Sequence, residues 1–443
     1  MNFTESYQFI LSLINLPRKE YMASAKECAF AMKRMDALLE LVGRPEKKIP
    51  HYIHVTGTSG KGSTVTYMHS ILHAAGKKVG SSYSPHAIDI TERWKYGGKQ
   101  MTKKEFADIV TQITPMLDTY LRTSTYDMPS FFEITEIIGL LWFAQKKTQW
   151  VVLEVGCGGR YDASNCIPKK DIAIITNIGR DHLGIIGNTV QEIAYEKAGI
   201  ITKGCTVYTA ETKKSLLQII QTEANKKQAP IIFHQPTYRV TKETLHASTF
   251  VYKKNTYTLR SLGTHQIHNA TLCIDVATKL GIPQQTIQKG IAGANQPLRM
   301  EVVQQSPIII CDGAHNEDKI RSTVNTIKKI QSNQKKKSSI HLIVGFSENK
   351  DITTMIKILS ELSPSSVACT RNTINISRTV AAPHALALLI KKHMPHTKTE
   401  LFLSPKDALV FAKKQQRKND ILLVTGSIFL SGEVKHSIQT NKK

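Results

Sequence analysis

Residues 54–64 read HVTGTSGKGST, and this stretch decides how the chain folds. The apolar segment Tyr52–Thr56 is typical of a buried strand and leads directly into the glycine-rich turn Gly57–Gly62. The next residues, Ser63–Ala75, predict a helix because their apolar side chains recur at helical spacing. Gly76 lies where a C-cap glycine would end that helix. Repetition of such strand–turn–helix units builds a parallel sheet that is covered by helices on both faces.

The turn itself has the composition of a phosphate-binding loop. Its glycines let several backbone N–H groups point at one anion, and the helix that follows directs its positive N-terminus to the same place. Lys61 adds a positive charge, and Ser63 or Thr64 offers a hydroxyl to Mg²⁺. The spacing departs from the standard G-x-x-x-x-G-K-[ST] motif, because Gly62 stands between the lysine and the serine. We therefore predict a variant nucleotide-binding loop; the alternative is a plain strand–helix connection.

Two further strands are predicted to join the first one in a parallel sheet, at Trp150–Val155 and Ile172–Thr176. The segment Val207–Leu262 is rich in alternating Thr, Tyr and Val, which predicts antiparallel strands in an insertion. A helix is expected near His268–Leu280.

A second α/β unit follows Pro297. Its predicted strands are Ile308–Cys311, His341–Val344, Ser366–Cys369 and Ile421–Val424. The predicted fold is therefore α/β with two domains: an N-terminal P-loop-type ATPase domain, 1–297, with a parallel sheet and a small antiparallel insertion, and a C-terminal Rossmann-like domain, 298–443.

The composition narrows the class of protein. The 443 residues are 41% hydrophobic and 21% charged, which is typical of globular chains. No run of 18 apolar residues predicts a membrane span, and no secretory leader is expected at the N-terminus. The seven cysteines include no C-x-x-C pair, which fits a reducing cytoplasm. We therefore expect a cytoplasmic protein.

The net charge of +24 raises the hypothesis of a nucleic-acid-binding ATPase. The lysines are spread along the chain, however, and no basic stripe is interleaved with aromatic residues. Anionic small molecules such as ATP and polyglutamates are a simpler use of a positive field. Nucleic-acid binding is therefore the disfavoured alternative.

Several polar residues follow predicted strands, where ligands bind in open α/β sheets. Glu154 ends a buried strand and is a good candidate for a Mg²⁺ ligand, because Mg²⁺ prefers hard oxygen donors. His182 follows the strand at Ile172–Thr176 and is either a metal ligand or an ordinary loop histidine. Ser84 precedes Pro85, which alone would indicate only a turn. Lys197 alone would be an exposed helix lysine.

Taken together, the ordered motifs of this chain resemble the folylpolyglutamate synthase/dihydrofolate synthase family of the Mur ligase superfamily. The motifs of the N-terminal half are the phosphate loop, Ser84-Pro85-His86, Thr91-Glu92-Arg93, Phe132-Glu133, Glu154–Asn165, Thr176–His182 and Glu196–Ile200. Those that follow are His265-Gln266, Asn269-Ala270, Arg299-Met300-Glu301, Asp312–Asn316, Lys350-Asp351, Thr425-Gly426-Ser427 and Gly432-Glu433-Val434. The resemblance covers nearly the whole chain.

The resemblance implies roles that the spacing of residues does not. ATP is implied to contact Gly57, Thr58, Ser59, Gly60, Lys61, Gly62, Ser63, Thr64, Asn269, Arg299 and Asp312. Two Mg²⁺ sites are implied at Ser63, Ser84, Glu154, His182 and Lys197. The pterin substrate is implied at Ser130, Phe131, Phe132, Glu133, Tyr161, Asp162 and Ala163. Catalytic roles are implied for Lys61, His182, Lys197, Arg299 and His315, with Lys197 carried as a carbamate.

Three positions depart from the family pattern. Ser59 stands where Asn is commoner in the phosphate loop, and Cys157 where Leu is commoner. Leu298-Arg299-Met300 replaces Gly-Arg-Leu. None of these changes removes a group that the chemistry needs, so they affect the expectation of substrate preference rather than of activity.

The activity implied by the resemblance is ATP-dependent addition of L-glutamate to folate, to dihydropteroate, or to both, through an acyl phosphate. The nearest alternative is a Mur-type ligase that adds an amino acid to a peptidoglycan precursor, which would share the ATP loop and metal groups. The expected partners are small molecules only, namely folate or dihydropteroate, L-glutamate and ATP, and the expected state is a monomer.

Overall fold

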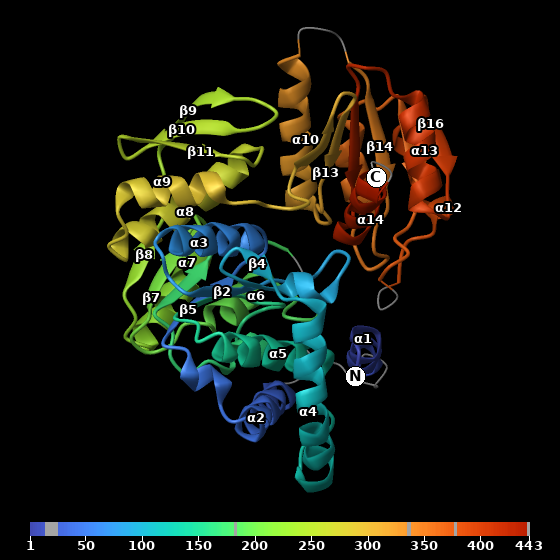
Figure 1. The fold of residues 1–443 in the computed structure, drawn as a ribbon. Coiled ribbons are helices and arrows are strands. Elements are labelled where there is room, and N and C mark those ends of the chain that lie inside the picture. The colour runs from blue at the N-terminus through green and yellow to red at the C-terminus, as the bar shows by residue number, and fades with distance from the viewer. Residues whose placement is uncertain (14–24, 181–183, 335–337, 376–378, 441–443) are drawn as a thin grey trace. The chain divides into compact units, whose positions relative to one another are not determined.

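The computed structural model describes residues 1–13, 25–180, 184–334, 338–375 and 379–440 (Figure 1). The chain divides into two compact units. Unit 1 contains Met1–Thr237 and Asn269–Ile291, and unit 2 contains Tyr238–His268 and Ala292–Lys443. Each unit has its own largely parallel sheet, as the alternation of strands and helices predicts. The α/β fold class and the two-domain architecture are confirmed.

The sheet of unit 1 has the strand order β4-β3-β2-β5-β1-β6-β7-β8. Its strands are β1 (His51–Thr56), β2 (Val79–Ser82), β3 (Trp94–Tyr96), β4 (Lys99–Gln100), β5 (Trp150–Glu154), β6 (Ile172–Ile175), β7 (Thr206–Thr209) and β8 (Ile231–Phe233). The strands β2, β5, β1, β6, β7 and β8 run parallel to one another. At one edge, β3 pairs antiparallel with β2, and β4 pairs antiparallel with β3.

Helices cover both faces of this sheet (Figure 1). The helices in this part of the chain are α1 (Phe3–Ser12), α2 (Ala25–Leu41), α3 (Lys61–Ala74), α4 (Lys103–Thr123), α5 (Phe131–Gln145), α6 (Val190–Ala198), α7 (Lys214–Lys226), α8 (Thr264–Lys279) and α9 (Gln284–Gly293). The described residues also form three short 3₁₀ helices: η2 (Pro45–Lys48) between α2 and β1, η3 (Ile90–Arg93) between β2 and β3, and η4 (Ala163–Cys166) between β5 and β6. The helix predicted after the glycine-rich turn is α3, and Gly76 follows its end with φ +72°.

One hydrophobic core of unit 1 contains residues of β1 and β5. Tyr52 and Val151 of these strands pack there with Ile134 of α5 and Phe106 of α4. Helix α5 is apolar around most of its circumference, which is typical of a helix that is buried on all sides. Burial of apolar surface contributes about 25 cal/mol per Å² to the free energy of folding. This burial stabilises the strands whose ends carry the site.

Unit 2 contains two sheets. The three-stranded antiparallel sheet has the order β11-β10-β9 and consists of β9 (Tyr238–Glu243), β10 (Ser248–Tyr252) and β11 (Asn255–Leu259). The six-stranded sheet has the order β12-β13-β17-β14-β15-β16 and is parallel except for β12. Its strands are β12 (Glu301–Gln305), β13 (Ile308–Cys311), β14 (Ile340–Val344), β15 (Ser366–Cys369), β16 (Lys398–Leu401) and β17 (Ile421–Thr425). Its helices are α10 (Glu317–Ser332), α11 (Ile352–Ser360), α12 (Pro383–His393), α13 (Pro405–Gln415) and α14 (Ile428–Thr440).

The prediction that Val207–Leu262 is entirely antiparallel is wrong for its first part. Strands β7 and β8 pair parallel and extend the main sheet, with α7 between them. Only Tyr238–Leu259 forms the antiparallel sheet. Alternating Thr, Tyr and Val suit an edge strand in either direction, because strand propensity reflects side-chain packing rather than the direction of the partner.

The antiparallel sheet groups with unit 2 through specific contacts. Glu243 forms an ion pair with Lys329 of α10, and Leu262 belongs to the apolar core around β13 and β14. The predicted domain boundary between residues 297 and 298 stays a prediction. Among the described residues, no helix is both long and apolar enough to cross a bilayer.

Candidate active site

Strand order brings the predicted site segments of unit 1 to one edge of the sheet. The four neighbouring strands β2, β5, β1 and β6 are parallel, so their carboxyl ends lie side by side. Ser84 follows β2, Glu154 ends β5, the phosphate loop follows β1, and Asn177 follows β6. Ligands bind at this edge in open α/β sheets. The structure thus gathers segments that are more than 90 residues apart in sequence.

The phosphate loop is held by the segment after β6. Thr58 N–H donates to the Asn177 carbonyl at 2.9 Å, and Ser59 N–H donates to the Asn177 side-chain oxygen at 2.8 Å. The Thr176 hydroxyl donates to the Ser59 carbonyl at 2.6 Å. Lys61 Nζ lies 2.9 Å from the Gly57 carbonyl, so its charge is folded back over the loop. These bonds give the loop a defined shape before any ligand arrives.

Two glycines of the loop are required by space as well as by backbone angle. A Cβ atom on Gly57 (φ +148°) would lie 1.8 Å from Thr176 Oγ1. One on Gly60 (φ +85°) would lie 2.5 Å from the side-chain oxygen of Asn269. Asn269, predicted to contact ATP, is therefore packed against the turn that begins α3. Gly60 caps that helix without a side-chain hydrogen bond, so the first N–H groups of α3 are not capped by its N-cap residue.

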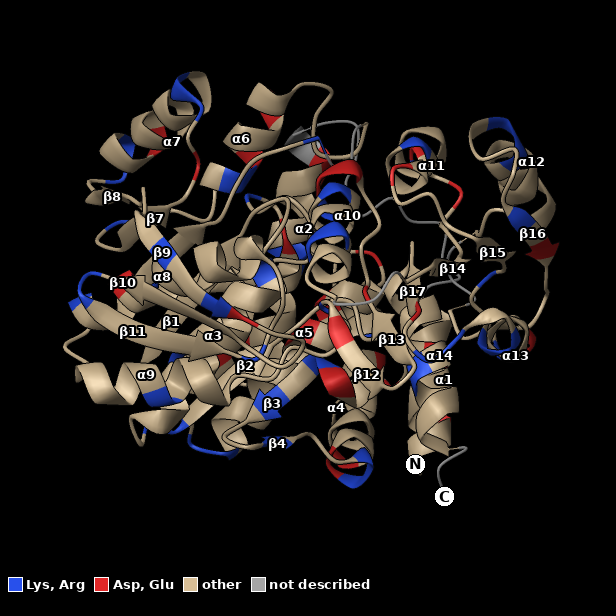
Figure 2. Ribbon diagram, turned by 90° about the horizontal axis from the view of Figure 1, so that it is seen from above, with Lys and Arg blue, Asp and Glu red and all other residues tan. Residues whose placement is uncertain are grey.

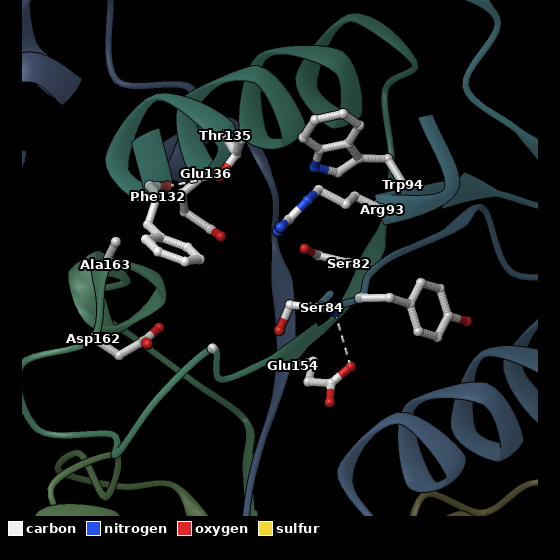
Figure 3. A pocket seen from close by; sticks show the side chains of 12 residues that line it. Ser82, Ser84, Arg93, Trp94, Phe132, Thr135, Glu136, Glu154, Asp162 and Ala163 are labelled. Atoms are coloured by element: carbon white, nitrogen blue, oxygen red, sulfur yellow. Dashed lines mark hydrogen bonds between the residues drawn. The ribbon is translucent and has the colours of Figure 1, made fainter. Parts of the chain in front are cut away.

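Glu154 and Ser84 lie together beside the loop. Glu154 is 7% exposed, and its carboxylate accepts the Ser84 N–H at 3.1 Å (Figure 3). The Ser84 hydroxyl oxygen lies 4.0 Å from the position that a Cβ atom on Gly156 would occupy. Because residue 156 is glycine, no side chain fills the space beside this hydroxyl. A carboxylate and a hydroxyl are oxygen donors of the kind that Mg²⁺ uses. These two predicted ligands are therefore neighbours in the fold, joined through the backbone N–H of Ser84.

The remaining predicted ligands are placed differently. His182 lies outside the described residues, together with Asp181. Lys197 lies near the end of α6 and is 3% exposed, so it is a buried lysine rather than a surface one. The described residues contain no group of three or more His, Cys, Asp and Glu side chains that converge on one point. The predicted second metal site, which includes His182, is not tested.

Helix α6 packs against the loop that follows Glu154. A Cβ on Gly159 would lie 2.9 Å from the Glu196 carbonyl, and Arg160 N–H donates to that carbonyl at 2.8 Å. Burial raises the pKa of Glu196 to about 6, although the nearby Arg160 and Lys197 oppose the shift. The loop that begins after Glu154 therefore packs directly against the end of α6, where Lys197 lies.

A pocket opens between β2, η3, α5 and the loop after β5 (Figure 3). It contains about 370 Å³ of empty space, including its open mouth. It is lined by Ser82, Tyr83, Ser84, Arg93, Trp94, Phe132, Thr135, Glu136, Glu154, Gly156, Asp162 and Ala163. Three predicted substrate contacts, Phe132, Asp162 and Ala163, are among these residues, and so are the predicted metal ligands Ser84 and Glu154.

Asp162 accepts three hydrogen bonds on one wall of the pocket. Its carboxylate accepts the Cys157 N–H at 2.8 Å and the Ser164 N–H at 3.0 Å. The Ser164 hydroxyl also donates to it, and the oxygen of that hydroxyl lies 2.8 Å from Nε2 of the buried His54. Burial lowers the pKa of His54 well below its ordinary value, so the ring is neutral and donates from Nε2. Three donors therefore hold the Asp162 carboxylate in place.

Arg93 supplies positive charge on the opposite wall. It is 6% exposed, and its Nε donates to His86 Nδ1 at 3.0 Å. Burial, followed by the charge of Arg93, lowers the pKa of His86 to about 3, so His86 is neutral and accepts this bond. The guanidinium also lies over the Phe131 ring at 5.4 Å and the Phe132 ring at 6.0 Å.

Other predicted substrate residues have structural roles in this fold. Ser130 and Glu133 form the capping box of α5, with each side chain accepting the other residue's N–H. Glu133 also forms an ion pair with Arg34 of α2 at 3.0 Å. Phe131 is buried at the start of α5, whereas Phe132 is 42% exposed toward the pocket. Tyr161 does not line the pocket.

Arg299, Asp312 and His315 belong to unit 2. Arg299 lies on a turn before β12, and Asp312 follows β13. Asp312 accepts the Met300 N–H at 3.3 Å and the Thr323 hydroxyl, so it holds this turn in place. Burial raises the pKa of Asp312, although Thr323 and Arg299 oppose the shift. His315 lies 2.7 Å from the Gly313 carbonyl through Nδ1.

The surface charge is not concentrated in one stripe. Lys and Arg occur on helices and loops of both units, interspersed with Asp and Glu (Figure 2). Lys413 and Lys414, for example, lie in the last turn of α13, where cations suit the negative helix end. This distribution gives no support to the nucleic-acid alternative.

Several residues of the pocket have no role that was predicted from the sequence. Arg93 belongs to a motif of the family resemblance to which no function was attached. No role was predicted for Ser82, Trp94, Thr135 or Glu136. Glu136 was available to sequence reasoning, because it lies four residues after Phe132 and residues at that spacing share one face of a helix. Ser82 and Trp94 required the pairing of β2 with β3, which only the tertiary structure provides.

Comparison with known proteins agrees with this geometry. The Mur ligase middle domain matches residues 55–277, and the Mur ligase glutamate ligase domain matches residues 298–428. The dihydrofolate synthase/folylpolyglutamate synthase of Bacillus subtilis is 33% identical over 420 residues, which cover 92% of this chain and 94% of that protein. The chain belongs to the folylpolyglutamate synthase/dihydrofolate synthase family of Mur-type ligases.

Solved structures of this family share the whole fold. One is E. coli FolC in complex with DHPP and ADP, with a TM-score of 0.81, 26% identity, and coverage of 99% of this chain and 98% of that one. Another is a bifunctional folylpolyglutamate synthase/dihydrofolate synthase with Mn, AMPPNP and L-glutamate bound, with a TM-score of 0.77, 26% identity, and coverage of 93% and 94%. The family relationship favours the folate branch over the peptidoglycan alternative.

Proposed function

We propose that the protein is an ATP-dependent ligase that joins L-glutamate to the carboxylate of a folate, of dihydropteroate, or of both. The observation that carries this proposal is the strand order, which places the phosphate loop, Glu154 with Ser84, and the pocket at one edge of the sheet. A nucleotide on the loop and a substrate in the pocket would therefore be neighbours. The bound DHPP, ADP, AMPPNP and L-glutamate of the similar structures support the same set of ligands.

The reaction requires two transfers. The acceptor carboxylate attacks the γ-phosphorus of ATP, the bond to the β,γ-bridging oxygen breaks, and ADP leaves. The glutamate amine then attacks the acyl carbon, inorganic phosphate leaves, and the amine proton passes to solvent or to a base. Because the protein makes no covalent bond in this scheme, its contribution is positioning and charge neutralisation.

In this proposal the phosphate loop binds the nucleotide. The N–H groups in the first turn of α3 face the phosphates, and Lys61 exchanges its bond to the Gly57 carbonyl for a phosphate oxygen. In this proposal Arg299 and His315 of unit 2 contact the γ-phosphate, and Asp312 and Asn269 contact other parts of ATP. Exclusion of water is needed because an acyl phosphate hydrolyses.

Two Mg²⁺ sites complete the proposal. Ser63, Ser84 and Glu154 would hold one ion beside the phosphates, and Glu154, His182 and a carbamylated Lys197 would hold the other. Bound Mg²⁺ would neutralise charge on the transferred phosphoryl group. Lys197 is buried near the end of α6, where that helix packs against the loop after Glu154, and this position supports the carbamate. We also propose that the enzyme is monomeric and cytoplasmic, and that residues 298–443 are its ligase domain. The match to the glutamate ligase domain begins at residue 298 and supports this domain assignment.

Glu154→Ala provides the test of this proposal. We expect it to abolish ATP- and glutamate-dependent product formation, with a loss of at least about 1000-fold, because the ion-binding oxygen is removed at the reacting phosphate. The assay is the mass of products formed from dihydropteroate and from tetrahydrofolate, offered separately. Glu400→Ala, on the exposed edge strand β16, is the matched control and should retain wild-type turnover. Unchanged ligation by Glu154→Ala, at an unchanged melting temperature, would refute the proposed site.

A further inference from the structure

Glu136 is a pocket residue that the mechanism above does not use. It lies on α5 one turn after Phe132, so both side chains are on the helix face that lines the pocket. In Figure 3 its carboxyl points into the space that the Arg93 guanidinium and the Ser82 hydroxyl also face. It makes no hydrogen bond with any residue in the described part of the chain, whereas Asp162 has three donors. Glu136 is thus a carboxyl directed into the pocket without a protein partner there.

The charges around the pocket favour a proton on Glu136. The Asp162 carboxylate lines the same pocket and accepts three hydrogen bonds. Two carboxyls in one small site avoid carrying charge together, so the second takes a proton more readily. Removal from bulk water, followed by the charge of Asp162, raises the pKa of Glu136 to about 8 against the opposing effect of Arg93. The charged or titratable groups that line the pocket with it are Tyr83 after β2, Arg93 on η3, Glu154 on β5 and Asp162 before η4.

A protonated carboxyl has a distinct recognition chemistry. It offers one O–H donor and one carbonyl acceptor on the same flat group, whereas a carboxylate offers acceptors only. A heterocycle such as a pterin presents ring nitrogens, a carbonyl oxygen and N–H groups along its edges, so a donor and an acceptor occur side by side. The exposed face of Phe132, one helical turn away, provides a surface on which a flat ring can stack.

We propose that Glu136 is a specificity-determining residue of the ligase, whose uncharged carboxyl forms a paired hydrogen bond with the edge of the substrate's heterocycle. This inference rests on the proposed function, since it assumes that the folate substrate occupies this pocket. It assigns Glu136 to binding and selectivity and gives it no part in phosphoryl transfer. Its loss should therefore raise the KM for the pterin substrate and leave the turnover number near that of the wild type.

Two substitutions of Glu136 separate the uncharged pairing from other roles. Glu136→Gln keeps one donor and one acceptor on a flat group of the same size, and Glu136→Leu removes both. The probes are dihydropteroate, 4-aminobenzoyl-glutamate, which lacks the heterocycle, and AMPPNP with Mg²⁺. Affinities are measured by calorimetry, and steady-state kinetics give KM and kcat for dihydropteroate. Glu400→Gln serves as the matched carboxyl-to-amide control.

We expect Glu136→Leu to weaken dihydropteroate binding by about tenfold, because a paired hydrogen bond in a partly buried site is lost. We expect Glu136→Gln to stay within about threefold of the wild type. Affinities for AMPPNP and 4-aminobenzoyl-glutamate should not change in either variant. Equal losses in Glu136→Gln and Glu136→Leu would overturn the uncharged pairing, and an unchanged affinity in Glu136→Leu would overturn any recognition role. If the wild type itself binds neither dihydropteroate nor tetrahydrofolate, the proposed function fails, which is a distinguishable result.

Discussion

The phosphate loop of unit 1 and the turn at residues 298–300 of unit 2 both hold left-handed backbone angles, but they do so with different residues. In the loop these angles belong to Gly57 (φ +148°) and Gly60 (φ +85°). In the turn they belong to Leu298 (φ +57°) and Met300 (φ +51°), on either side of Arg299. Left-handed angles cost a side-chain-bearing residue about 1–2 kcal/mol, so the turn is strained where the loop is not.

The difference follows from what surrounds each segment. The loop has no room for side chains, because Thr176 and Asn269 occupy the positions where Cβ atoms would go. The turn instead buries its side chains, with Leu298 at 3% and Met300 at 2% exposure. Its backbone is held by the Gly313 N–H, which donates to the Leu298 carbonyl at 2.8 Å, and by Asp312. Glycine makes a phosphate loop by local geometry, whereas the turn that presents Arg299 depends on tertiary contacts that offset its strain.

Between the loop and the turn, the largest expected effect comes from Gly57→Ala in the loop. A new Cβ at 1.8 Å from Thr176 Oγ1 displaces the residue that holds Ser59, so the N–H groups lose their common direction. We expect AMPPNP affinity to fall by about 100-fold, measured by calorimetry.

Gly76→Ala is the control for this prediction. Gly76 has a similarly unfavourable φ of +72°, but no atom within 4 Å of the added Cβ. It should therefore lower stability by about 1 kcal/mol without a change in AMPPNP affinity. Equal losses of affinity in both alanine variants would show that strain, and not the filled space of the loop, is responsible.

A smaller effect is expected from Asp312→Ala in unit 2. This change leaves the Met300 N–H and the buried Thr323 hydroxyl without their acceptor, at a cost of about 1–3 kcal/mol. The urea midpoint of unfolding should therefore be lower for Asp312→Ala than for the wild type. The midpoint of Asp312→Asn should fall less, because this variant retains one acceptor oxygen. A midpoint for Asp312→Ala equal to that of the wild type would mean that the turn does not depend on this carboxyl.

The smallest effect distinguishes two substitutions at one position. Leu298→Ala and Leu298→Gly both remove the buried side chain, but only glycine relieves the left-handed strain. We expect Leu298→Gly to be more stable than Leu298→Ala by about 1 kcal/mol, which is the reverse of the usual order. Urea unfolding of the two variants measures the difference. A more stable alanine variant would contradict the strain that distinguishes the turn from the loop.

The elements themselves were largely predictable. Strands β1, β13, β15 and β17 agree with the predicted segments to within one residue at each end, because buried parallel strands are continuous apolar runs. The phosphate loop was predictable because its glycines, lysine and hydroxyls are consecutive. The parallel pairing of β7 and β8 was not, since an alternating segment does not specify the direction of its partner.

The pocket was predictable only in part. Asp162 and Phe132 were found through the family resemblance, but Arg93 and Glu136 come from segments more than 40 residues apart in sequence. Glu133 was predicted as a substrate contact, and the structure shows its carboxyl engaged in capping α5 and in an ion pair with Arg34. A carboxyl near a helix start can serve either purpose, and local sequence does not distinguish them.

The sequence by itself determined the α/β class, the phosphate loop and the identity of the family, because each depends on residues that are consecutive or on motifs in a fixed order. The tertiary structure alone decided that β2, β5, β1 and β6 are neighbours, and hence that Ser84, Glu154 and the loop lie along one edge. It also decided which residues meet in the pocket, among them Arg93 on η3 and Glu136 on α5. The physical reason is that strand order and burial arise from packing between distant segments, which no local pattern encodes.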